Sequence, residues 1–355
     1  MLFLAQKDAR QWLVSLICSD PLQASGACHR SLQLMEILEC DGWRLQPIDP
    51  PSAPTSRLST IKHSLRSIVC HGPLLPIGRD SWRSQGHVAH SVHDLHRRFP
   101  ALRGVIQEGT GFGGLAALAE WHRRGVCTVV VPANIEALAP NHDSWTHRGQ
   151  DVTQRFANER RWWAVADAIF TISIEEAWWL QLHGIAAEHL PYFPATERAK
   201  ALTRIASERQ PDAEVGWLWL ADFRNPANRT GVFMTLQWLK DCIQPPEYLV
   251  IAGRGCDWLN SNYGSQLPPY ARLLGEVSDV NLQQIYRRCI AQLIVHPATS
   301  GMLTRVVDAA LAGIPIVGNS MALKSYAAYF ADGKVASIPR KPLDEESRFL
   351  KQLDS

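Results

Sequence analysis

The sequence has no strong excess of charge of either sign. Its 355 residues include 36 lysines and arginines against 34 aspartates and glutamates, which gives a formal net charge of +2. A protein that holds nucleic acid through the phosphates presents a basic stripe or a basic domain. The near balance of charge therefore argues against nucleic acid as a partner.

Long hydrophobic runs are also missing. The opening stretch, MLFLAQKDARQWLVSLICS, is interrupted by Lys7, Asp8 and Arg10. A membrane-spanning helix needs about 20 predominantly apolar residues in succession, and a secretory leader needs an unbroken apolar region after its charged start. The opening stretch therefore fits neither a transmembrane span nor a signal peptide.

The eight cysteines form no C-x-x-C motif, and the sequence contains no D-x-D. Such cysteine spacing indicates reduced thiols and a cytoplasmic protein. Histidines recur at three-residue intervals in GHVAHSVHDLHRRF, namely His87, His90, His93 and His96. That interval drifts around a helix, whereas four apolar residues keep one helical stripe: Val88, Val92, Leu95 and Phe99. We therefore predict solvated histidines beside a buried stripe, and no metal site.

What the sequence does contain suits a large core. Hydrophobic residues make up 46% of the 355 positions, a length typical of two domains. Short apolar runs such as CTVVVP and AQLIVHP alternate with helical patterns such as LAALAEWHRRG and TRVVDAALAG. This alternation indicates parallel sheets covered by helices on both faces. The rhythm stops over 190–216, which holds three prolines and a charged run, and then restarts.

We therefore expect an α/β protein of two Rossmann-like, doubly wound parallel-sheet domains. The expected divisions are an N-terminal domain over 1–195, a linker over 196–213, a C-terminal domain over 214–335 and a tail or helix over 336–355. In open α/β sheets, ligands bind beyond the carboxyl ends of the strands. Two such edges facing each other would form an interdomain cleft.

One motif in the first half suggests a dinucleotide. The stretch VIQEGTGFGGLAALAEW contains Gly109, Gly111 and Gly114, a complete G-x-G-x-x-G. In a dinucleotide fold, the next strand should end in an acidic residue that holds the ribose. Here that strand ends in Pro132–Ala133, and Glu136 lies beyond it. A tight strand-to-helix turn explains the glycines better, so an NAD-dependent oxidoreductase ranks third among our hypotheses.

The second half carries a series of motifs in a recognisable order. QLIVHPATSGMLTRVVDAALAGIPIVGN contains a strand ending at His296–Pro297, the loop Ser300–Gly301, a helix with Asp308 and the run Ala312–Val317. Upstream, YLVIAGRG and LLGEVSDVNLQQIYRRC fit the same order. In the first half, SGACHRSLQLMEILECDG combines a glycine loop with a helical pattern. Over roughly residues 11–335, the sequence resembles the GT-B glycosyltransferases, in particular the retaining group 1 or family 4 enzymes.

The sequence departs from the family pattern at several functional positions. The family has two glutamates eight positions apart, where this chain has Ser300 and Asp308. The family also has a basic pair near the first strand of the second domain. The nearest candidates in this chain are Arg224 and Arg229, in ADFRNPANRTG. The family commonly has a histidine at the position where this chain, in VVPANIE, has Ala133. The motifs of nucleotide binding are thus better matched than those of catalysis.

The resemblance implies a donor site in the second half and an acceptor side in the first. The turn at 300–304 opens a helix whose free N–H groups and dipole suit a diphosphate, and Asp308 is expected to bind the ribose hydroxyls. The implied donor-binding residues are Ser300, Gly301, Met302, Leu303, Thr304, Arg305, Asp308, Gly275, Val277 and Gly253. The implied acceptor-side residues are Ser25, Gly26, Gly109, Gly111, Gly113 and Asn134. The expected catalytic residues are Arg224, Arg229 and Glu136.

The expected function is transfer of a sugar from a nucleotide-diphosphate sugar to a hydroxyl of a glycan or lipid-linked acceptor. The resemblance implies retention of configuration, no metal, and no cofactor, since the nucleotide sugar is a substrate. An inverting enzyme would need a base, with Glu136, Glu108 and Asp20 as candidates. Peripheral contact with the inner face of a membrane stays open. The alternative, motivated by Ser300, is a non-catalytic protein of the same fold that binds a sugar nucleotide or a glycan.

Overall fold

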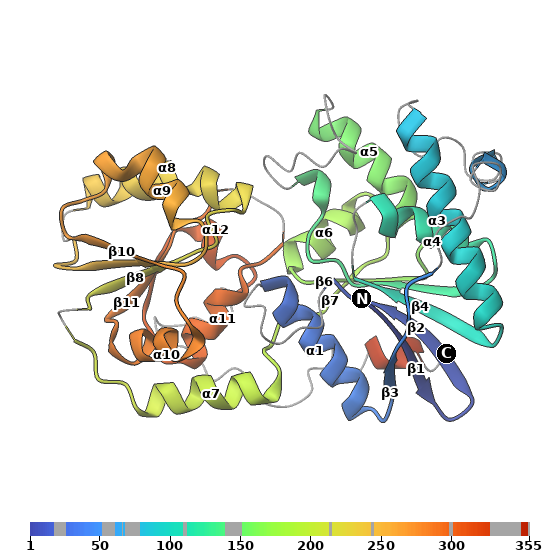
Figure 1. Ribbon diagram of the computed structural model, residues 1–355, viewed down its shortest axis with the longest axis horizontal. Coiled ribbons are helices and arrows are strands. Elements are labelled where there is room, and N and C mark those ends of the chain that lie inside the picture. Colours follow the sequence, from blue (N-terminus) through green and yellow to red (C-terminus); the bar gives the residue numbers. More distant parts are fainter. Residues whose placement is uncertain are drawn as a thin grey trace. The chain divides into compact units, whose positions relative to one another are not determined.

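The computed structural model describes residues 1–17, 26–51, 61–65, 67, 79–108, 112–138, 151–212, 215–242, 245–297, 301–326 and 349–353. The chain divides into two α/β units (Figure 1). The first unit holds Met1–Leu138, Asp143–Pro191 and Lys341–Ser355. The second holds Ala139–His142 and Tyr192–Arg340.

The described sheet of the first unit has seven strands in the order β3-β1-β2-β4-β5-β6-β7. Their bounds are β1 Leu2–Lys7, β2 Arg10–Ser15, β3 Arg44–Pro47, β4 Leu102–Gln107, β5 Cys127–Val130, β6 Ala168–Thr171 and β7 Glu188–His189. From β2 to β7 all neighbouring strands pair in parallel. β1 pairs antiparallel with both β2 and β3, so one edge of this sheet is antiparallel.

This antiparallel edge differs from the expectation that the sheet is parallel. The charges that interrupt the apolar run belong to a hairpin: Asp8, at φ 54°, lies in the turn between β1 and β2. Lys7, at the end of β1, forms an ion pair with Asp41 at 2.7 Å. The guanidinium of Arg10 lies over the ring of Trp43, 5.5 Å from its centroid. The charged residues Lys7, Asp8 and Arg10 therefore lie at a turn between two paired strands.

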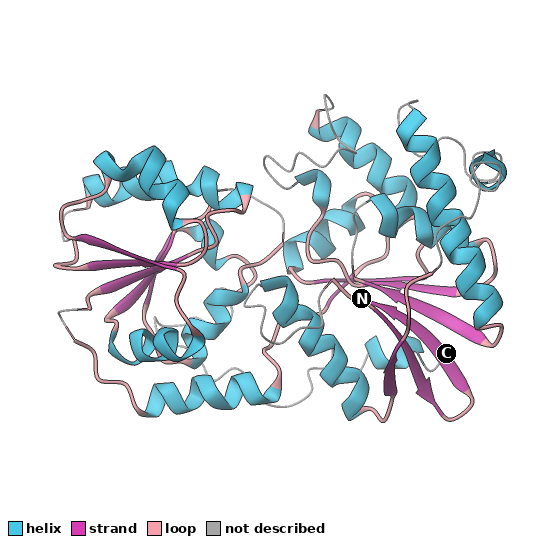
Figure 2. Ribbon diagram, in the orientation of Figure 1, coloured by secondary structure: helices cyan, strands magenta, loops and turns pink. Residues whose placement is uncertain are grey.

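Helices cover both faces of the first sheet. They are α1 Gly26–Cys40, α3 Arg79–Arg98, α4 Phe112–His122, the 3-10 helix η1 Glu136–Leu138, α5 Val152–Trp163 and α6 Ile174–Leu182. Leu34 and Leu38 of α1 pack on one face, with Trp12. Residues of α3 and α4 pack against the other face, and α4, α5 and the strands β5 and β6 share a further cluster. The sheet is thus a buried middle layer (Figure 2).

The described sheet of the second unit has five strands, all parallel, in the order β10-β9-β8-β11-β12. Their bounds are β8 Trp217–Leu220, β9 Leu249–Ala252, β10 Ala271–Gly275, β11 Ala291–Ile294 and β12 Ile316–Gly318. The helices are α7 Thr196–Ser207, α8 Pro226–Asp241, α9 Cys256–Tyr263, the 3-10 helix η2 Gly264–Gln266, α10 Asp279–Arg288, α11 Thr304–Leu311 and α12 Ser320–Leu323. Helices α8 and α9 pack on one face, and α7, α10 and α11 on the other (Figure 2).

The stretch expected to be a linker, 196–213, is largely helical. Thr196–Ser207 forms α7, whose Leu202 and Ile205 are buried in the core of the second unit. The apolar residues of this charged segment recur at helical spacing, so one face of α7 can be buried while the other stays in water. The division between the units falls at Pro191 and Tyr192.

Part of the expected tail, 336–355, also belongs to a core. Residues 349–353 are helical, and Phe349 is fully buried in the first unit. Its ring meets that of Phe170 edge-on, with centroids 5.3 Å apart. This contact joins residues about 180 positions apart in sequence, so no local pattern could have revealed it.

Two expectations concern the environment of the chain. None of the helices in the described ranges is long and apolar enough to cross a membrane. The expectation of reduced thiols holds for Cys40, Cys127, Cys242, Cys256 and Cys289, which are free. It fails at Cys28, which is disulfide-bonded.

Candidate functional site

The second sheet has a switch point at its middle. From β8 the chain first builds β9 and β10 on one side, and then returns to build β11 and β12 on the other. The helices that follow β8 and β11 therefore pack on opposite faces of the sheet, and an open α/β sheet is expected to have a crevice at such a switch point. In open α/β sheets, such a crevice at the carboxyl ends of the strands is where ligands bind.

The loops at this edge are joined through their backbones. The N–H of Phe223 donates to the carbonyl of Arg254 at 2.7 Å, and the N–H of Gly253 donates to the carbonyl of Gly275 at 2.7 Å. Gly253 has φ 128°, and a Cβ on it would collide with the carbonyl of Ala221. The predicted site residue Gly253 is thus required by the close approach of the loops after β8 and β9.

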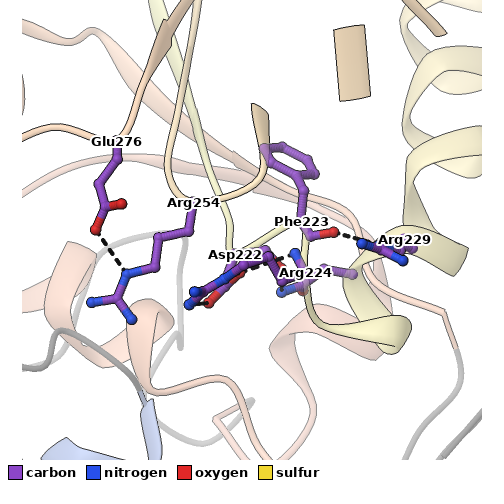
Figure 3. Close-up of polar contacts among 7 residues, drawn as sticks. Asp222, Phe223, Arg224, Arg229, Arg254 and Glu276 are labelled. Atoms are coloured by element: carbon purple, nitrogen blue, oxygen red, sulfur yellow. Dashed lines mark hydrogen bonds and ion pairs between the residues drawn. The ribbon is translucent and has the colours of Figure 1, made fainter. Parts of the chain in front are cut away.

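Arginines gather on these loops, most of them with an acidic partner (Figure 3). Arg224 forms an ion pair with Asp222 at 2.8 Å, and Arg254 forms one with Glu276 at 2.9 Å. Burial would raise the pKa of Asp222, but the hydrogen bonds and charge of Arg224 outweigh burial and lower it. The predicted catalytic residue Arg224 is therefore already neutralised by its neighbour.

Arg229, the second predicted basic residue, is held differently. Its Nε donates to the carbonyl of Phe223 at 2.7 Å (Figure 3), and its guanidinium lies 4.5 Å from the centroid of the Trp258 ring. It forms no ion pair with any residue that the structure describes. A carbonyl and an aromatic face orient the guanidinium but leave its positive charge uncompensated.

Arg305 is the most unusual cation of the edge. It is the second residue of α11, and its Nη1 and Nη2 lie 3.5 and 3.4 Å from Oδ1 of Asn228. Its Nε is buried without a hydrogen-bond partner, and within the described ranges no carboxylate pairs with it. Burial lowers the pKa of Arg305 to about 10. A buried cation of this kind is costly unless a ligand supplies the opposite charge.

Asn228 brings the starts of two helices together. It lies in the first turn of α8, and its Nδ2 donates to the carbonyl of Asp222 at 2.9 Å while its Oδ1 faces Arg305. The N-terminus of α8 is capped by Asn225, whereas Leu303, which precedes α11, provides no side-chain cap. No side chain therefore caps the first N–H groups of α11, and these groups lie beside Arg305.

The predicted ribose ligand Asp308 is engaged inside the second unit. Only 2% of Asp308 is exposed, and its Oδ2 accepts from Nη2 of Arg198, on α7, at 2.6 Å. Oδ1 lies 3.4 Å from the hydroxyl of Tyr192. This ion pair offsets the effect of burial on Arg198 and raises its pKa. Asp308 therefore fastens α7 to α11, and its role toward a ribose stays a prediction.

His296 belongs to the motif of the second half, but that motif assigns it no function. It lies just beyond β11, is 4% exposed, and its Nδ1 is 3.1 Å from the carbonyl of Pro297. Burial, followed by the charge of Arg305, lowers the pKa of His296 to about 4. The imidazole is therefore neutral near pH 7 and adds no positive charge to that of Arg305.

The remaining predicted donor residues lie in the turn after β10 and at the start of α11. Gly275 ends β10 in the left-handed region at φ 75°, and Val277 follows in the loop before α10. Gly301 has φ 72°, and Met302 and Leu303 lead into Thr304, the first residue of α11. Ser300 lies outside the described residues.

At the carboxyl edge of the first sheet lies a buried carboxylate. Glu108 follows β4 and is fully buried, and its Oε2 accepts from the N–H of Ile17 at 2.8 Å and from the hydroxyl of Ser31 at 2.5 Å. Its Oε1 has no hydrogen-bond partner. Burial raises the pKa of Glu108 to about 7, against the opposing effects of Ser31, Ile17 and Arg30.

The other acceptor-side predictions lie around the same edge. Asn134 and Glu136 follow β5 and are half-buried, and the carboxylate of Glu176 fixes their loop by accepting the N–H of Ile135 at 2.7 Å. Gly26 is the first residue of α1, and Gly113 lies in the first turn of α4. Ser25, Gly109, Gly111 and Asp20 lie outside the described residues.

The histidine segment differs from the expectation of simple solvated flanks. The ring of His63 lies 5.1 Å from that of His90 and 5.6 Å from that of His93, while His96 packs against Trp121. Burial and the neighbouring His90 lower the pKa of His63. Among the described residues, however, no group of three or more histidine, cysteine or acidic side chains could hold a metal ion.

Solved structures with the same two-unit architecture are known. A sucrose-phosphate synthase from Thermosynechococcus elongatus matches 87% of this chain with 81% of its own, at a TM-score of 0.53 and 14% identity. TarM matches 76% of this chain with 51% of its own, at 0.49 and 10%. HepE from Anabaena, solved with UDP-glucose, matches 76% with 78% of its own, at 0.44 and 12%.

No protein-family model matches the sequence, and no curated protein matches it. The match to the sucrose-phosphate synthase shows the fold, and it confirms the expected class of two Rossmann-like α/β units as in GT-B glycosyltransferases. The two weaker matches add nothing to that conclusion. What the site does must be argued from its own residues.

Proposed function

We propose that this chain is a glycosyltransferase that moves a sugar from a nucleotide-diphosphate sugar to an acceptor hydroxyl. The observation that carries the proposal is Arg305, whose buried Nε has no partner and whose guanidinium faces no described carboxylate. Its place beside the start of α11, at the switch point of a five-stranded parallel sheet, fits a diphosphate.

The basic side chains of the site have a chemical task in this reaction. When the bond between the sugar and the diphosphate breaks, negative charge grows on the leaving phosphate oxygen. Guanidinium groups at Arg305 and Arg229, with the first N–H groups of α11, stabilise that charge more strongly in the transition state than in the bound substrate. Since these groups supply the positive charge, we propose that transfer needs no metal ion.

We further propose that the reaction retains the configuration at the anomeric carbon, in line with the family that the sequence resembles. In that course the leaving phosphate oxygen takes the proton of the acceptor hydroxyl, and the new bond forms on the same face of the sugar. The acceptor, a glycan or a lipid-linked sugar, would bind the first unit near Asn134 and Glu136. An inverting course would instead need a base, for which Glu108 and Glu136 are the described candidates.

The nucleoside would be bound by the turn after β10 and by Asp308 of α11, which follow strands on opposite sides of β8. The turn at Gly275 and Val277 offers backbone groups to a base, and Oδ1 of Asp308 lies 3.4 Å from the hydroxyl of Tyr192. A ribose hydroxyl could donate to Oδ1 while Oδ2 stays paired with Arg198. This arrangement gives Asp308 both a structural and a binding role.

Calorimetric titration of UDP, GDP and ADP into the wild type and Arg305→Met tests the diphosphate site. We expect Arg305→Met to weaken the preferred nucleotide by about 1.5–3 kcal/mol, or roughly 10- to 100-fold, because a charge-assisted hydrogen bond is lost. Arg287→Met is the matched control, since Arg287 lies on α10 and pairs with Glu208 at 2.8 Å. Equal affinity in Arg305→Met and the wild type would contradict the assignment.

The alternative is a non-catalytic protein that binds a sugar nucleotide or a glycan. It is favoured by Ser300, where the related enzymes have an acid, and by the engagement of Asp308 with Arg198. Mass spectrometry of transferred and hydrolysed sugar, over a panel of nucleotide sugars, separates the two functions. Tight binding with neither product would support the alternative. Activity lost in EDTA and restored by magnesium or manganese would contradict metal-independent transfer.

A further inference from the structure

His296 is a buried titratable side chain to which the proposed reaction assigns no role. It lies directly after β11, the strand next to β8, and only 4% of it is exposed. Its Nδ1 lies 3.1 Å from the carbonyl of Pro297. Because a carbonyl only accepts, Nδ1 carries the ring hydrogen and donates it. Nε2 is therefore the nitrogen that can take up a proton.

The backbone at His296 is fixed from two sides. Its N–H donates to Oδ1 of Asn319 at 3.2 Å, and its carbonyl accepts from Nδ2 of Asn319 at 2.8 Å. Helix α8 packs closely on the same stretch of chain. A Cβ on Gly231 would lie 3.1 Å from Cδ of Pro297 and 4.0 Å from Cα of His296, so a glycine permits this approach.

Helix α8 also reaches Arg305, the proposed diphosphate ligand. Asn228 precedes Gly231 by three residues, and its Oδ1 lies 3.4 and 3.5 Å from the two Nη atoms of Arg305. Residues three apart are neighbours on the surface of a helix. The start of α8 therefore has Arg305 and the backbone of His296 along the same side.

The charges that act on the imidazole come from two other elements. They are those of Arg305, on α11, and of Lys324, directly after α12. Burial is the largest cause of the low pKa of His296, and these two positive charges lower the pKa further, against the hydrogen bond with Pro297. A second cation beside Arg305 is thus disfavoured as long as no anion is present.

We propose that His296 takes up a proton from solvent when a nucleotide diphosphate binds beside Arg305. This inference rests on the proposed diphosphate site. The negative charges of the two phosphates would offset the positive charge of Arg305 and favour another cation nearby. One N–H bond forms at Nε2, and no other bond changes. The imidazole is then neutral in the free chain and positively charged in the complex.

Proton uptake makes the affinity for the donor depend on pH. The pKa of His296 is about 4 in the free chain, and in the complex it should rise toward its ordinary value of 6.5 or above. A group whose pKa rises on binding strengthens binding as pH falls through the upper of the two values. The affinity should therefore increase about tenfold from about pH 7.5 to about pH 5.5.

Calorimetric titration of the full chain with UDP-glucose, GDP-mannose and ADP-glucose tests the proposal. The diphosphate of these probes is esterified at both ends, so it stays fully ionised over this range of pH. Titrations in two buffers of different ionisation enthalpy give the number of protons taken up. For the probe that binds, we expect about one proton per ligand at about pH 5.5 and far less at about pH 7.5.

Two variants locate the proton. His296→Gln should lose both the proton uptake and the increase in affinity at lower pH, because an amide does not titrate. The matched control is His87→Gln, since His87 is exposed on α3 of the first unit, and this variant should keep both effects. Melting curves show whether each variant is folded.

Nuclear magnetic resonance of the histidine ring carbons follows the wild type without relying on a variant. Among the 13 histidines, one imidazole should titrate near pH 4 in the free chain and at higher pH with the nucleotide sugar bound. Arg305→Met should raise the pKa of this imidazole in the free chain, because a neighbouring positive charge is removed.

The outcomes distinguish this inference from the proposed function. A nucleotide sugar that binds at about pH 5.5 without proton uptake, or with the same uptake in His296→Gln, would overturn the inference and leave the diphosphate site standing. An Arg305→Met variant in which no imidazole titrates at higher pH would also overturn it. If none of the three probes binds at either pH, the proposed function and the inference both fail.

Discussion

The carboxyl edges of the two sheets each contain a buried arginine, but the two are satisfied to very different degrees. In the first unit, Arg30 is fully buried and donates to the carbonyls of Leu190 and Pro191 at 2.7 and 3.1 Å, and to Gln33 at 2.6 Å. In the second unit, the Nη atoms of Arg305 have only Oδ1 of Asn228 as a hydrogen-bond partner among the described residues, at 3.4 and 3.5 Å. The first arginine supports the fold, whereas the second has binding capacity left for a ligand.

The carboxylates show the opposite arrangement. Asp308 in the second unit is paired with Arg198 at 2.6 Å, whereas Glu108 in the first unit forms no ion pair with a described residue and has one oxygen without a partner. Each edge thus has one satisfied and one incompletely satisfied charged group. The incomplete group is an acid in the first unit and a cation in the second. The proposed reaction assigns a hydroxyl-bearing acceptor to the first unit and a diphosphate to the second, and this difference supports that proposal.

The largest effect is expected from removing the satisfied arginine. Arg30→Met should lower the free energy of unfolding by about 3–5 kcal/mol, because three buried hydrogen bonds are lost and only the carbonyl of Pro191 keeps a second donor, Nε2 of Gln33. Urea unfolding followed by circular dichroism measures this change. Arg97→Met is the control, since the Arg97 side chain is 77% exposed and should contribute little. A loss below about 1 kcal/mol for Arg30→Met would show that the clamp on Leu190 and Pro191 is dispensable.

The second prediction concerns pH and Glu108. Burial raises the pKa of Glu108 from 4.5 to about 7 in the folded chain. Between these two values the folded state holds a proton that the unfolded state has released, so stability from this group is present at low pH and falls as pH rises from about 4.5 to 7.

Glu108→Gln removes this dependence. Relative to the wild type, the variant should gain stability as pH rises through that window, by roughly 3 kcal/mol at the upper end. Ser31 and Ile17 can still donate to the amide oxygen, so the local hydrogen bonds survive. Urea unfolding at several pH values between 4 and 8 measures the difference. A difference that does not change with pH would mean that Glu108 is ionised throughout.

These contrasts also explain what could be read from the sequence. The apolar runs around Ile251 and Leu293 gave the strands of the second sheet, because a buried parallel strand is apolar along its whole length. The motif residues 292–319 form a strand, a helix and a strand in the order that the motif predicted, namely β11, α11 and β12. The charged hairpin at Asp8 and the helix α7 were missed, since each has polar residues that resemble a break or a linker.

The state of each charge could not be read from the sequence. Asp308 and its partner Arg198 are 110 positions apart, and Glu108 and Ser31 are 77 apart. Whether Arg305 has a counter-ion depends on which side chains the fold brings next to it. The motif that contains Arg305 does not show which side chains these are. The sequence therefore predicted that Asp308 and Arg305 belong to the site but could not predict that the acid is paired and the cation is not.

An intermediate effect is expected at Asp308. Asp308→Asn should reduce the free energy of unfolding by about 1–3 kcal/mol, because Arg198 loses its ion pair while Tyr192 keeps an acceptor. The control is Glu208→Gln, which breaks the exposed pair with Arg287 and should cost under about 0.5 kcal/mol. Equal stability of Asp308→Asn and the wild type would mean that this carboxylate serves binding rather than the contact between α7 and α11.

The smallest effect on stability is expected from the unsatisfied arginine. Arg305→Met removes a charge that has no described counter-ion, and the thioether chain of methionine fits an apolar surrounding, so the free energy of unfolding without ligand should stay within about 1 kcal/mol of the wild type or rise. The comparison becomes sharpest when the nucleotide is added. At a free concentration of 100 times its dissociation constant, a ligand of the folded state adds about 2.7 kcal/mol to the stability of the wild type. The same concentration should add only about 0.4–1.4 kcal/mol to the variant if its affinity falls roughly 10- to 100-fold. Urea unfolding of both proteins, with and without nucleotide, measures all four values. If Arg305→Met is as destabilising as Arg30→Met in the absence of nucleotide, both arginines support the fold, and the proposed distinction between the two edges is wrong.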